Sequence, residues 1–110
     1  MKHDCVVVWT TVARSANCRE MASILVNERL AACVNVLAEM ESIYRWKGQV
    51  ERSEEFRLMF KCNAAQLPRL SAYISQHHPY DTPEWIVVEA AQVGEKYLSW
   101  ANSSSSNSTL

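Results

Sequence analysis

The sequence predicts a single α+β domain in which an antiparallel four-stranded sheet carries two helices on one face. Three observations support this class. Strand-like and helix-like segments follow one another in the order βαββαβ, a tight turn joins the two central strand segments, and the 110 residues are 48% apolar. Such a chain is long enough for one hydrophobic core and too short for two. We expect the domain to span 1–102 and a mobile Ser/Asn-rich tail to span 103–110.

The first strand and the first helix are predicted near the amino terminus. Residues 5–12 (CVVVWTTV) form a β-branched run, whose continuity is typical of a central strand buried on both faces. Asn17 and Glu20 have the spacing of a capping box, and apolar residues recur beyond them at helical intervals. A first helix is therefore expected over 18–29.

Two long strand segments follow, joined at a turn that contains Gly48. Residues 32–46 (ACVNVLAEMESIYRW) are rich in strand-forming side chains, and this length predicts a bend or bulge near 37–41. Gly48 takes a positive φ at little cost, as a tight turn requires. The return segment alternates, with four apolar residues on one face: Phe56, Leu58, Phe60 and Cys62. These two segments predict an extended hairpin.

A second helix is predicted from the capping-box spacing of Asn63 and Gln66, with Pro68 in its first turn and its end near His77.

The last part of the chain is predicted to contain one more strand and a short helix. Pro79 and Pro83 bracket a rigid turn, after which residues 85–89 (WIVVE) predict the fourth strand. Gly94 then interrupts the chain before a short amphipathic segment that carries Tyr97, Leu98 and Trp100.

This order of elements specifies the ferredoxin-like fold, because right-handed crossovers place both helices on one face of the sheet. The other face and the two edge strands then need another cover. The chain also contains more aromatic surface than the core of such a small domain readily uses. Burial between subunits explains this excess, which comprises Trp9, Tyr44, Trp46, Tyr80, Trp85, Tyr97 and Trp100.

Composition argues against two classes of partner. Eleven basic and twelve acidic residues give a net charge of -1, so no positive field attracts nucleic acid. No apolar run approaches the roughly 18 residues that a membrane span needs. The chain also leads directly into a strand-like segment, without room for a signal sequence. We therefore expect a cytoplasmic protein with no nucleic-acid or membrane partner.

The four cysteines indicate neither a metal site nor a disulfide. Cys5, Cys18, Cys33 and Cys62 contain no Cys-x-x-Cys pair, the pattern of redox dithiols and zinc ribbons. Three of them lie in or beside apolar runs, where a free cysteine packs as a small apolar side chain. With two glycines in the chain, neither a G-x-G-x-x-G motif nor a P-loop can be formed. No catalytic residue is predicted, and we expect no enzymatic activity.

Four stretches carry a family resemblance. In order, they are 31–36 (AACVNV), 42–48 (SIYRWKG), 78–84 (HPYDTPE) and 97–100 (YLSW). They resemble the signature stretches of the CutA divalent-cation-tolerance family, and the similarity runs from about Cys5 to Trp100. The resemblance implies a homotrimer in which long hairpins complete the neighbouring sheets, a cytoplasmic location, and a link to copper and other divalent cations. It implies no reaction.

His77 and His78 are candidate metal ligands, because neutral imidazole suits copper, nickel and zinc. Consecutive helical residues point about 100° apart, so one ion can bind both only if the backbone leaves the helix at Pro79. In some bacterial members of the family a Cys at the position of Thr10 joins these histidines in a proposed copper site. A hydroxyl is a poorer copper ligand than a thiolate. The alternative is that these histidines cap the helix and contact a neighbouring subunit.

Two further metal candidates are Glu84 and His3. Glu84 follows the same turn as an oxygen ligand; its alternative role is hydrogen bonding to the backbone of the Pro-rich loop. The sequence Met1-Lys2-His3 can enclose Cu(II) or Ni(II) between the terminal amine, two amides and the imidazole, in the square-planar geometry that these ions prefer. The alternative is that His3 is an accidental histidine in a frayed terminus.

Other residues are expected at a subunit interface and in a cleft. Glu55, Arg57 and Lys61 lie on the polar face of the third strand, where they can line a cleft between subunits together with Tyr80; the alternative is an exposed, salt-bridged strand face. The residues expected at the interface are Tyr44, Trp46, Tyr80 and Trp100.

The function predicted from these observations is a homotrimer that binds copper or another divalent cation and takes part in the response to metal ions. The alternative is a regulatory or scaffold trimer that binds a small anion or a partner protein in its clefts, in the manner of PII proteins. Use of the same fold for RNA binding or for an acylphosphatase-like reaction is disfavoured, because 55–62 (EFRLMFKC) lacks the aromatic pattern of an RNA-recognition strand and the first loop has no glycine-rich anion cradle.

Overall fold

A computed structural model describes residues 5–13 and 17–106. Strands and helices follow one another in these ranges in the predicted order, including the short carboxy-terminal helix, and one 3-10 turn is additional. The elements are β1 (Cys5–Ala13), α1 (Cys18–Asn27), β2 (Cys33–Trp46), β3 (Gln49–Asn63), η1 (Ala64–Gln66), α2 (Leu67–His77), β4 (Ile86–Glu89) and α3 (Glu95–Ser104).

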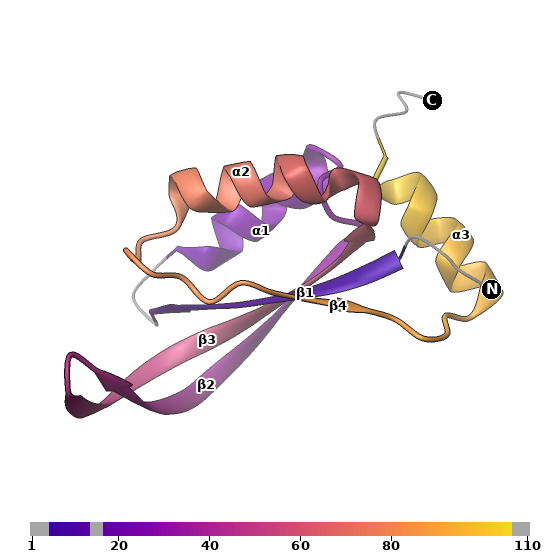
Figure 1. Cartoon of the computed structure of the whole chain (residues 1–110). Coiled ribbons are helices and arrows are strands. Elements are labelled where there is room, and N and C mark those ends of the chain that lie inside the picture. Colours follow the sequence, from indigo (N-terminus) through magenta and orange to yellow (C-terminus); the bar gives the residue numbers. More distant parts are fainter. Residues whose placement is uncertain (1–4, 14–16, 107–110) are drawn as a thin grey trace.

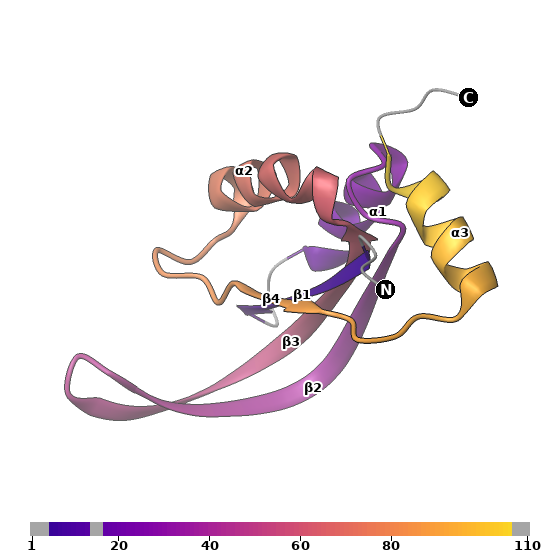
Figure 2. The ribbon, with the colours of Figure 1, turned by 45° about the vertical axis from the view of Figure 1, so that its right-hand side comes forward.

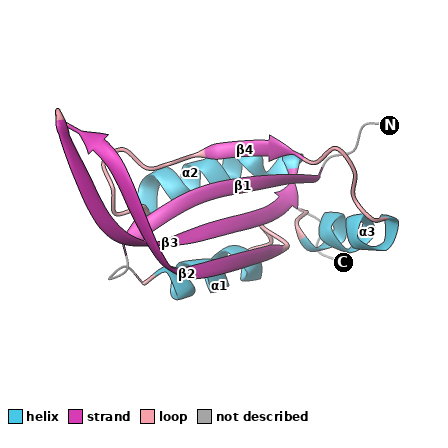
Figure 3. Ribbon diagram, turned by 90° about the horizontal axis from the view of Figure 1, so that it is seen from below, coloured by secondary structure: helices cyan, strands magenta, loops and turns pink. Residues whose placement is uncertain are grey.

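The strands form one antiparallel sheet in the order β2-β3-β1-β4. Helices α1 and α2 lie side by side on one face (Figure 1). The opposite face is left without a helical layer and is seen from below in Figure 3, with α3 beyond one end of the sheet. The predicted ferredoxin-like architecture is therefore confirmed.

The hydrophobic core lies between the sheet and these two helices. Val8 of β1 and Leu58 and Phe60 of β3 are fully buried there, together with Leu25 of α1 and Leu70 of α2. Burying a side chain of this size contributes about 1.5–3 kcal/mol. The alternation predicted for β3 is correct, because every second residue from 56 to 62 is buried. By contrast, Val7 and Trp9 are only half-buried, so β1 is not buried on both faces as predicted.

Both predicted caps are present, with adjustments. Asn17 Oδ1 accepts a hydrogen bond from the Glu20 amide at 3.3 Å, and its side-chain amide donates to the Glu20 carboxylate at 2.8 Å. Asn63 Oδ1 accepts from the Ala65 amide at 2.9 Å, but the turn that it caps is the 3-10 turn η1. Helix α1 ends earlier than predicted, and Arg29 takes a φ of 63°.

The β2–β3 hairpin extends well past the helical layer (Figure 2). The register between the strands shifts between Leu37 and Met40, where the sequence predicted a bulge, and Glu39 has a φ of 58°. Gly48 has a φ of 78° at the tip, as its position in the turn predicted.

The tail does not begin where it was predicted. Ser103 lies in α3, and Ser105 is fully buried. The Ser105 hydroxyl donates to the Ala101 carbonyl at 2.7 Å and accepts from the Asn63 amide at 2.8 Å. The boundary predicted after residue 102 is therefore too early, because small hydroxyl side chains here satisfy buried backbone groups. Residues 107–110 lie outside the described ranges.

None of the helices in the described ranges is long and apolar enough to cross a membrane. All four cysteines are free thiols; Cys5, Cys18 and Cys62 are buried, and Cys33 is half-buried.

Candidate functional site

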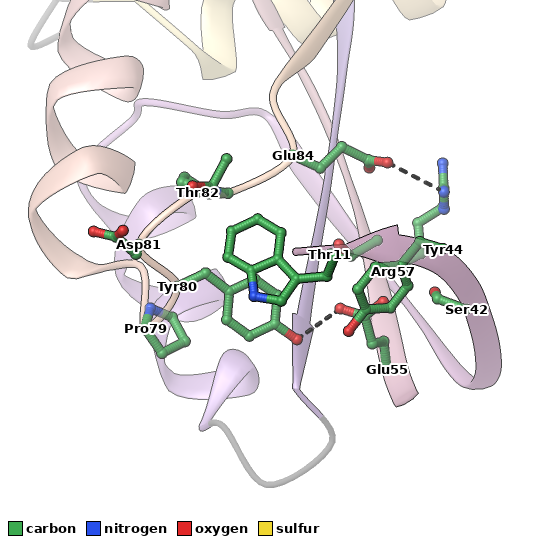
Figure 4. A pocket seen from close by; sticks show the side chains of 12 residues that line it. Thr11, Ser42, Tyr44, Glu55, Arg57, Pro79, Tyr80, Asp81, Thr82 and Glu84 are labelled. Carbon is green, nitrogen blue, oxygen red and sulfur yellow. Dashed lines mark hydrogen bonds and ion pairs between the residues drawn. The ribbon is translucent and has the colours of Figure 1, made fainter. Parts of the chain in front are cut away.

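A cavity of about 660 Å³ lies between the β2–β3 hairpin and the segment after α2 (Figure 4). Its walls come from four parts of the chain: β1, the outer half of β2, β3, and residues 79–84. The lining residues are Thr11, Ser42, Tyr44, Trp46, Glu55, Arg57, Pro79, Tyr80, Asp81, Thr82, Pro83 and Glu84.

The bulge in β2 decides which hairpin side chains reach this cavity. Before the bulge, Leu37 pairs with Arg57, so the odd-numbered residues of β2 share the uncovered face with Arg57. After the bulge, Tyr44 pairs with Glu51, and the even-numbered residues lie on that face. Because side chains alternate along a strand, one extra residue exchanges the two faces. Without it, Tyr44 and Trp46 would lie on the opposite side of the hairpin.

A buried carboxylate forms one wall of the cavity. Glu55 is only 6% exposed, and its Oε2 accepts a hydrogen bond from the Tyr80 hydroxyl at 2.6 Å (Figure 4). Burial, together with the hydrogen bond to Glu55 and its charge, raises the pKa of the Tyr80 phenol well above its usual range. Tyr80 therefore stays protonated and joins the 79–84 segment to β3.

Arg57 and Glu84 form an ion pair across the cavity at 3.6 Å. The Arg57 guanidinium also lies over the Trp9 ring, 5.0 Å from its centroid. The second carboxylate oxygen of Glu84, Oε2, is buried and accepts no hydrogen bond from the part of the chain that the structure describes. Buried polar atoms are normally hydrogen-bonded, so the missing donor at this oxygen is unusual.

His78 connects α2, β1 and the 79–84 segment. Its Nε2 lies 2.8 Å from the Thr11 carbonyl and therefore carries the proton, while its Nδ1 accepts from the Tyr80 amide at 3.0 Å. The buried Thr10 hydroxyl lies 3.3 Å from Nε2 and donates to the Glu84 carbonyl at 2.6 Å. Burial lowers the pKa of His78, partly offset by the bond to Thr11 and by the charge of Glu55. Both ring nitrogens are thus used within the fold.

His77 is arranged differently. Its ring is exposed and stacks on Tyr73 at 4.1 Å, and its Nδ1 lies 2.9 Å from the Tyr73 carbonyl, to which it donates. Its Nε2 has no hydrogen-bond partner among the residues that the structure describes. Over residues 5–13 and 17–106, no group of three or more His, Cys, Asp and Glu is placed to hold one metal ion. His3 lies outside the described residues.

The other expected site residues divide between two places. Tyr44, Trp46, Tyr80 and Arg57 line the cavity. Lys61 is not among the residues that line the cavity. Its ammonium lies 5.8 Å from the centroid of the ring of Tyr97, a residue of α3. Trp100 is also on α3, where it contacts Tyr97, and its ring is 46% exposed.

Four polar lining residues were not identified from the sequence: Thr11, Ser42, Asp81 and Thr82. Ser42 could have been found by combining the predicted bulge with strand alternation. Thr11 comes from an apolar run, and Asp81 and Thr82 come from a loop, in which no spacing rule marks them.

The comparisons with known proteins agree with this architecture. A family model described as "CutA1 divalent ion tolerance protein" matches residues 6–104. The "Divalent-cation tolerance protein CutA" of Yersinia pestis (strain Pestoides F) is 40% identical over 101 residues, which cover 92% of this chain and 85% of that protein. The chain belongs to the CutA family.

Solved CutA structures share the fold. CutA1 from Oryza sativa has a TM-score of 0.90 and 33% identity, covering 96% of this chain and 97% of that one. The divalent cation tolerance protein of Thermus thermophilus has a TM-score of 0.87 and 36% identity, covering 93% of this chain and 99% of that one. The CutA resemblance seen in the four sequence stretches is therefore confirmed.

Proposed function

We propose that this CutA chain is a cytoplasmic homotrimer that binds copper or another divalent cation, contributes to tolerance of metal ions, and catalyses no reaction. The observation that carries the proposal is the match of residues 6–104 to the divalent ion tolerance family. The relatives are named for cation tolerance and not for a reaction.

Unpartnered apolar surface supports the assembly. The two edges of the sheet, β2 and β4, have no neighbouring strand within the described chain, and exposed edges of this kind invite pairing. Because the two edges differ, joining one to the other in the next copy gives a head-to-tail contact, and such contacts form a closed ring when the rotation between copies allows it. Large apolar residues are exposed along these edges, at the start of β3 and on α3: Ile43, Tyr44, Trp46, Val50, Ile86, Val87, Val88, Tyr97 and Trp100.

Sedimentation equilibrium at micromolar concentration tests the assembly. We expect about three times the 12.5 kDa chain mass. A monomer mass across the concentration range would refute the trimer.

The free Nε2 of His77 supports metal binding at the end of α2. Imidazole nitrogen is a ligand that copper and zinc accept readily. His78 can join it only by giving up its bonds to Thr11 and Tyr80, and Thr10 offers a hydroxyl where a thiolate would bind copper more strongly. Further ligands from another subunit, from Glu84 or from water would complete the coordination. We therefore expect modest affinity.

Calorimetric titration with Cu²⁺ and Zn²⁺ tests the metal site. His77→Gln should weaken binding, while Gln76→Ala, an exposed change on the same helix turn, should not. Binding should also weaken as pH falls through the imidazole range, because only neutral histidine coordinates. If His77→Gln and His77→Gln with His78→Gln both leave the titration unchanged, the proposed site is wrong, and a His3→Gln variant shows whether the amino-terminal motif binds instead.

A regulatory or scaffold role is the second candidate, because the cavity of about 660 Å³ has the size of a small-molecule site. Its three carboxylates against one guanidinium disfavour a small anion as its ligand. A partner protein or a ligand of opposite charge suits this lining better.

A further inference from the structure

We propose that the cavity between the hairpin and residues 79–84 binds a protonated primary or secondary aliphatic amine. This inference goes beyond metal tolerance and concerns a different part of the molecule from the free nitrogen of His77. It depends on the charge of the cavity, on one unsatisfied acceptor oxygen, that of Glu84, and on its aromatic walls.

The charge of the lining favours a cation. Glu55, Asp81 and Glu84 contribute three carboxylates, and Arg57 contributes the one guanidinium among the lining residues. That guanidinium is held by Glu84 and by the Trp9 ring. Glu55, although almost fully buried, forms no ion pair with any lysine or arginine of the described chain. A buried carboxylate of this kind is stabilised when a cation reaches it.

The hydrogen-bonding groups require a ligand that donates. Glu84 Oε2 is a buried acceptor with no donor among the residues that the structure describes. Glu55 accepts from Tyr80 through one oxygen, and Tyr80 points its hydroxyl at that carboxylate and not into open space (Figure 4). An ammonium carries two or three N–H donors, and charge-assisted bonds from N–H to carboxylate are about twice as strong as neutral ones.

The aromatic walls suit the organic part of such a cation. Tyr44 and Trp46 come from the hairpin, and Tyr80 comes from the opposite wall. Aromatic faces attract alkylammonium groups, and cages of this kind recognise them in other proteins.

Other ligand classes fit less well. A phosphate or carboxylate would meet three like charges. A bare divalent ion needs several oxygen or nitrogen ligands at about 2 Å, and the described residues contain no cluster that supplies them. An aliphatic mono- or diamine matches the charge, the acceptors and the apolar walls together.

Calorimetric titration of the full chain with 1,4-diaminobutane tests the proposal. Tetramethylammonium is the comparison cation without N–H donors, and 1,4-butanediol is the uncharged comparison. We expect saturable binding of the diamine, at least about fivefold weaker binding of tetramethylammonium, and none of the diol. Equal binding of tetramethylammonium would overturn the assignment, since the unsatisfied oxygen of Glu84 would then play no part.

Two variants and a matched control locate the site. Glu55→Gln and Glu84→Gln each remove one charge and keep the size of the side chain, and each should weaken diamine binding by about tenfold or more. Glu28→Gln removes the same charge from an exposed position at the end of α1, away from the cavity, and should change binding less than about twofold. Far-UV circular dichroism checks that the variants are folded.

Failure of the amine proposal can be distinguished from failure of the proposed metal function. No diamine binding by the wild-type chain at about 10 mM ligand, or equal loss in all three variants, would refute the amine site. Copper titration of the wild-type chain and of Glu55→Gln reports on metal binding separately, and the Glu55 substitution should leave it unchanged.

Discussion

The Nε2–H of His78 donates a hydrogen bond to the backbone carbonyl of Thr11 over 2.8 Å. This bond connects the end of α2 to β1, and the Tyr80 amide bonded to Nδ1 extends the connection into the cavity wall. The two adjacent histidines therefore have different roles, because within the described chain His77 bonds to Tyr73 of its own helix and its side chain is exposed. The following predictions separate these roles.

His78→Ala should lower the free energy of unfolding by about 1–3 kcal/mol, because it removes two hydrogen bonds and leaves the Thr11 carbonyl and the Tyr80 amide without their partner. His77→Ala should change it by less than about 0.5 kcal/mol, since its ring is exposed. Urea unfolding followed by circular dichroism measures both. Equal effects of the two substitutions would contradict the distinction.

Stability should fall in mild acid through His78. Burial lowers its pKa in the folded state below the ordinary value of 6.5. Below pH 6.5 the unfolded chain therefore binds the proton more readily than the folded chain, and stability decreases until the pH reaches the lower folded-state value. The contribution is fully present above 6.5. Urea midpoints measured from pH 7.5 to 5 should decline less in His78→Gln than in wild type, whereas His77→Gln should retain the wild-type slope.

Tyr80→Phe should lower the free energy of unfolding by an amount that depends on pH. The raised pKa of Tyr80 means that its contribution is complete below the ordinary value of 10.0 and is lost as pH rises above it. At neutral pH the variant should be less stable by about 1 kcal/mol, the usual contribution of one hydrogen bond. The difference from wild type should shrink above pH 10. A constant difference up to pH 11 would show that the bond to Glu55 does not control this titration.

Trp46→Ala should weaken assembly while the helices and sheet of the subunit stay intact. The Trp46 ring is 43% exposed near the hairpin tip, and a buried aromatic anchor commonly contributes about 2 kcal/mol or more to an interface. Sedimentation across a dilution series should detect earlier dissociation, and far-UV circular dichroism should be unchanged. An unaltered trimer at the lowest concentration, with unaltered thermal stability, would exclude Trp46 as an anchor.

Two of the four thiols, Cys33 and Cys62, should react in a defined order. Burial, with a smaller effect of Cys5, raises the pKa of Cys62 to about 12, and its side chain is fully buried. Cys33 is half-buried and bonds only to Asn35. Iodoacetamide at pH 8, followed by peptide mass spectrometry, should therefore label Cys33 before Cys62. Labelling of Cys62 at the same rate in the native chain would show that its part of the core opens readily.

Much of the fold could be predicted because local patterns and burial agree. The alternation from Phe56 to Cys62 matches one buried face of β3, and Asn17 caps α1 at the predicted position. The start of the tail could not be predicted from composition, because Ser105 is buried through bonds to Asn63 and Ala101, two partners that only the tertiary structure brings together.

The candidate site was only partly predictable for a similar reason. Arg57, Tyr80 and Glu84 came from residue type and family resemblance, and all three line one cavity. Glu55 was expected near Tyr80, but its burial and its hydrogen bond to Tyr80, 25 residues away along the chain, are set by the tertiary structure. The sequence pattern also treated His77 and His78 as one metal pair, whereas the hydrogen bonds of His78 are set by the position of β1.

The length of the hairpin bears on the order in which the chain folds. Beyond the bulge, the outer parts of β2 and β3 have only each other as partners within the described chain, since β1 pairs with β3 no further than Glu55. An isolated two-stranded ribbon is at best marginally stable in water. The outer hairpin of a newly made subunit should therefore open and close while the core beneath α1 and α2 is already formed. If copies of the chain meet through this hairpin, its last step of ordering is bimolecular, and the concentration of the protein sets how fast the cavity acquires its aromatic wall.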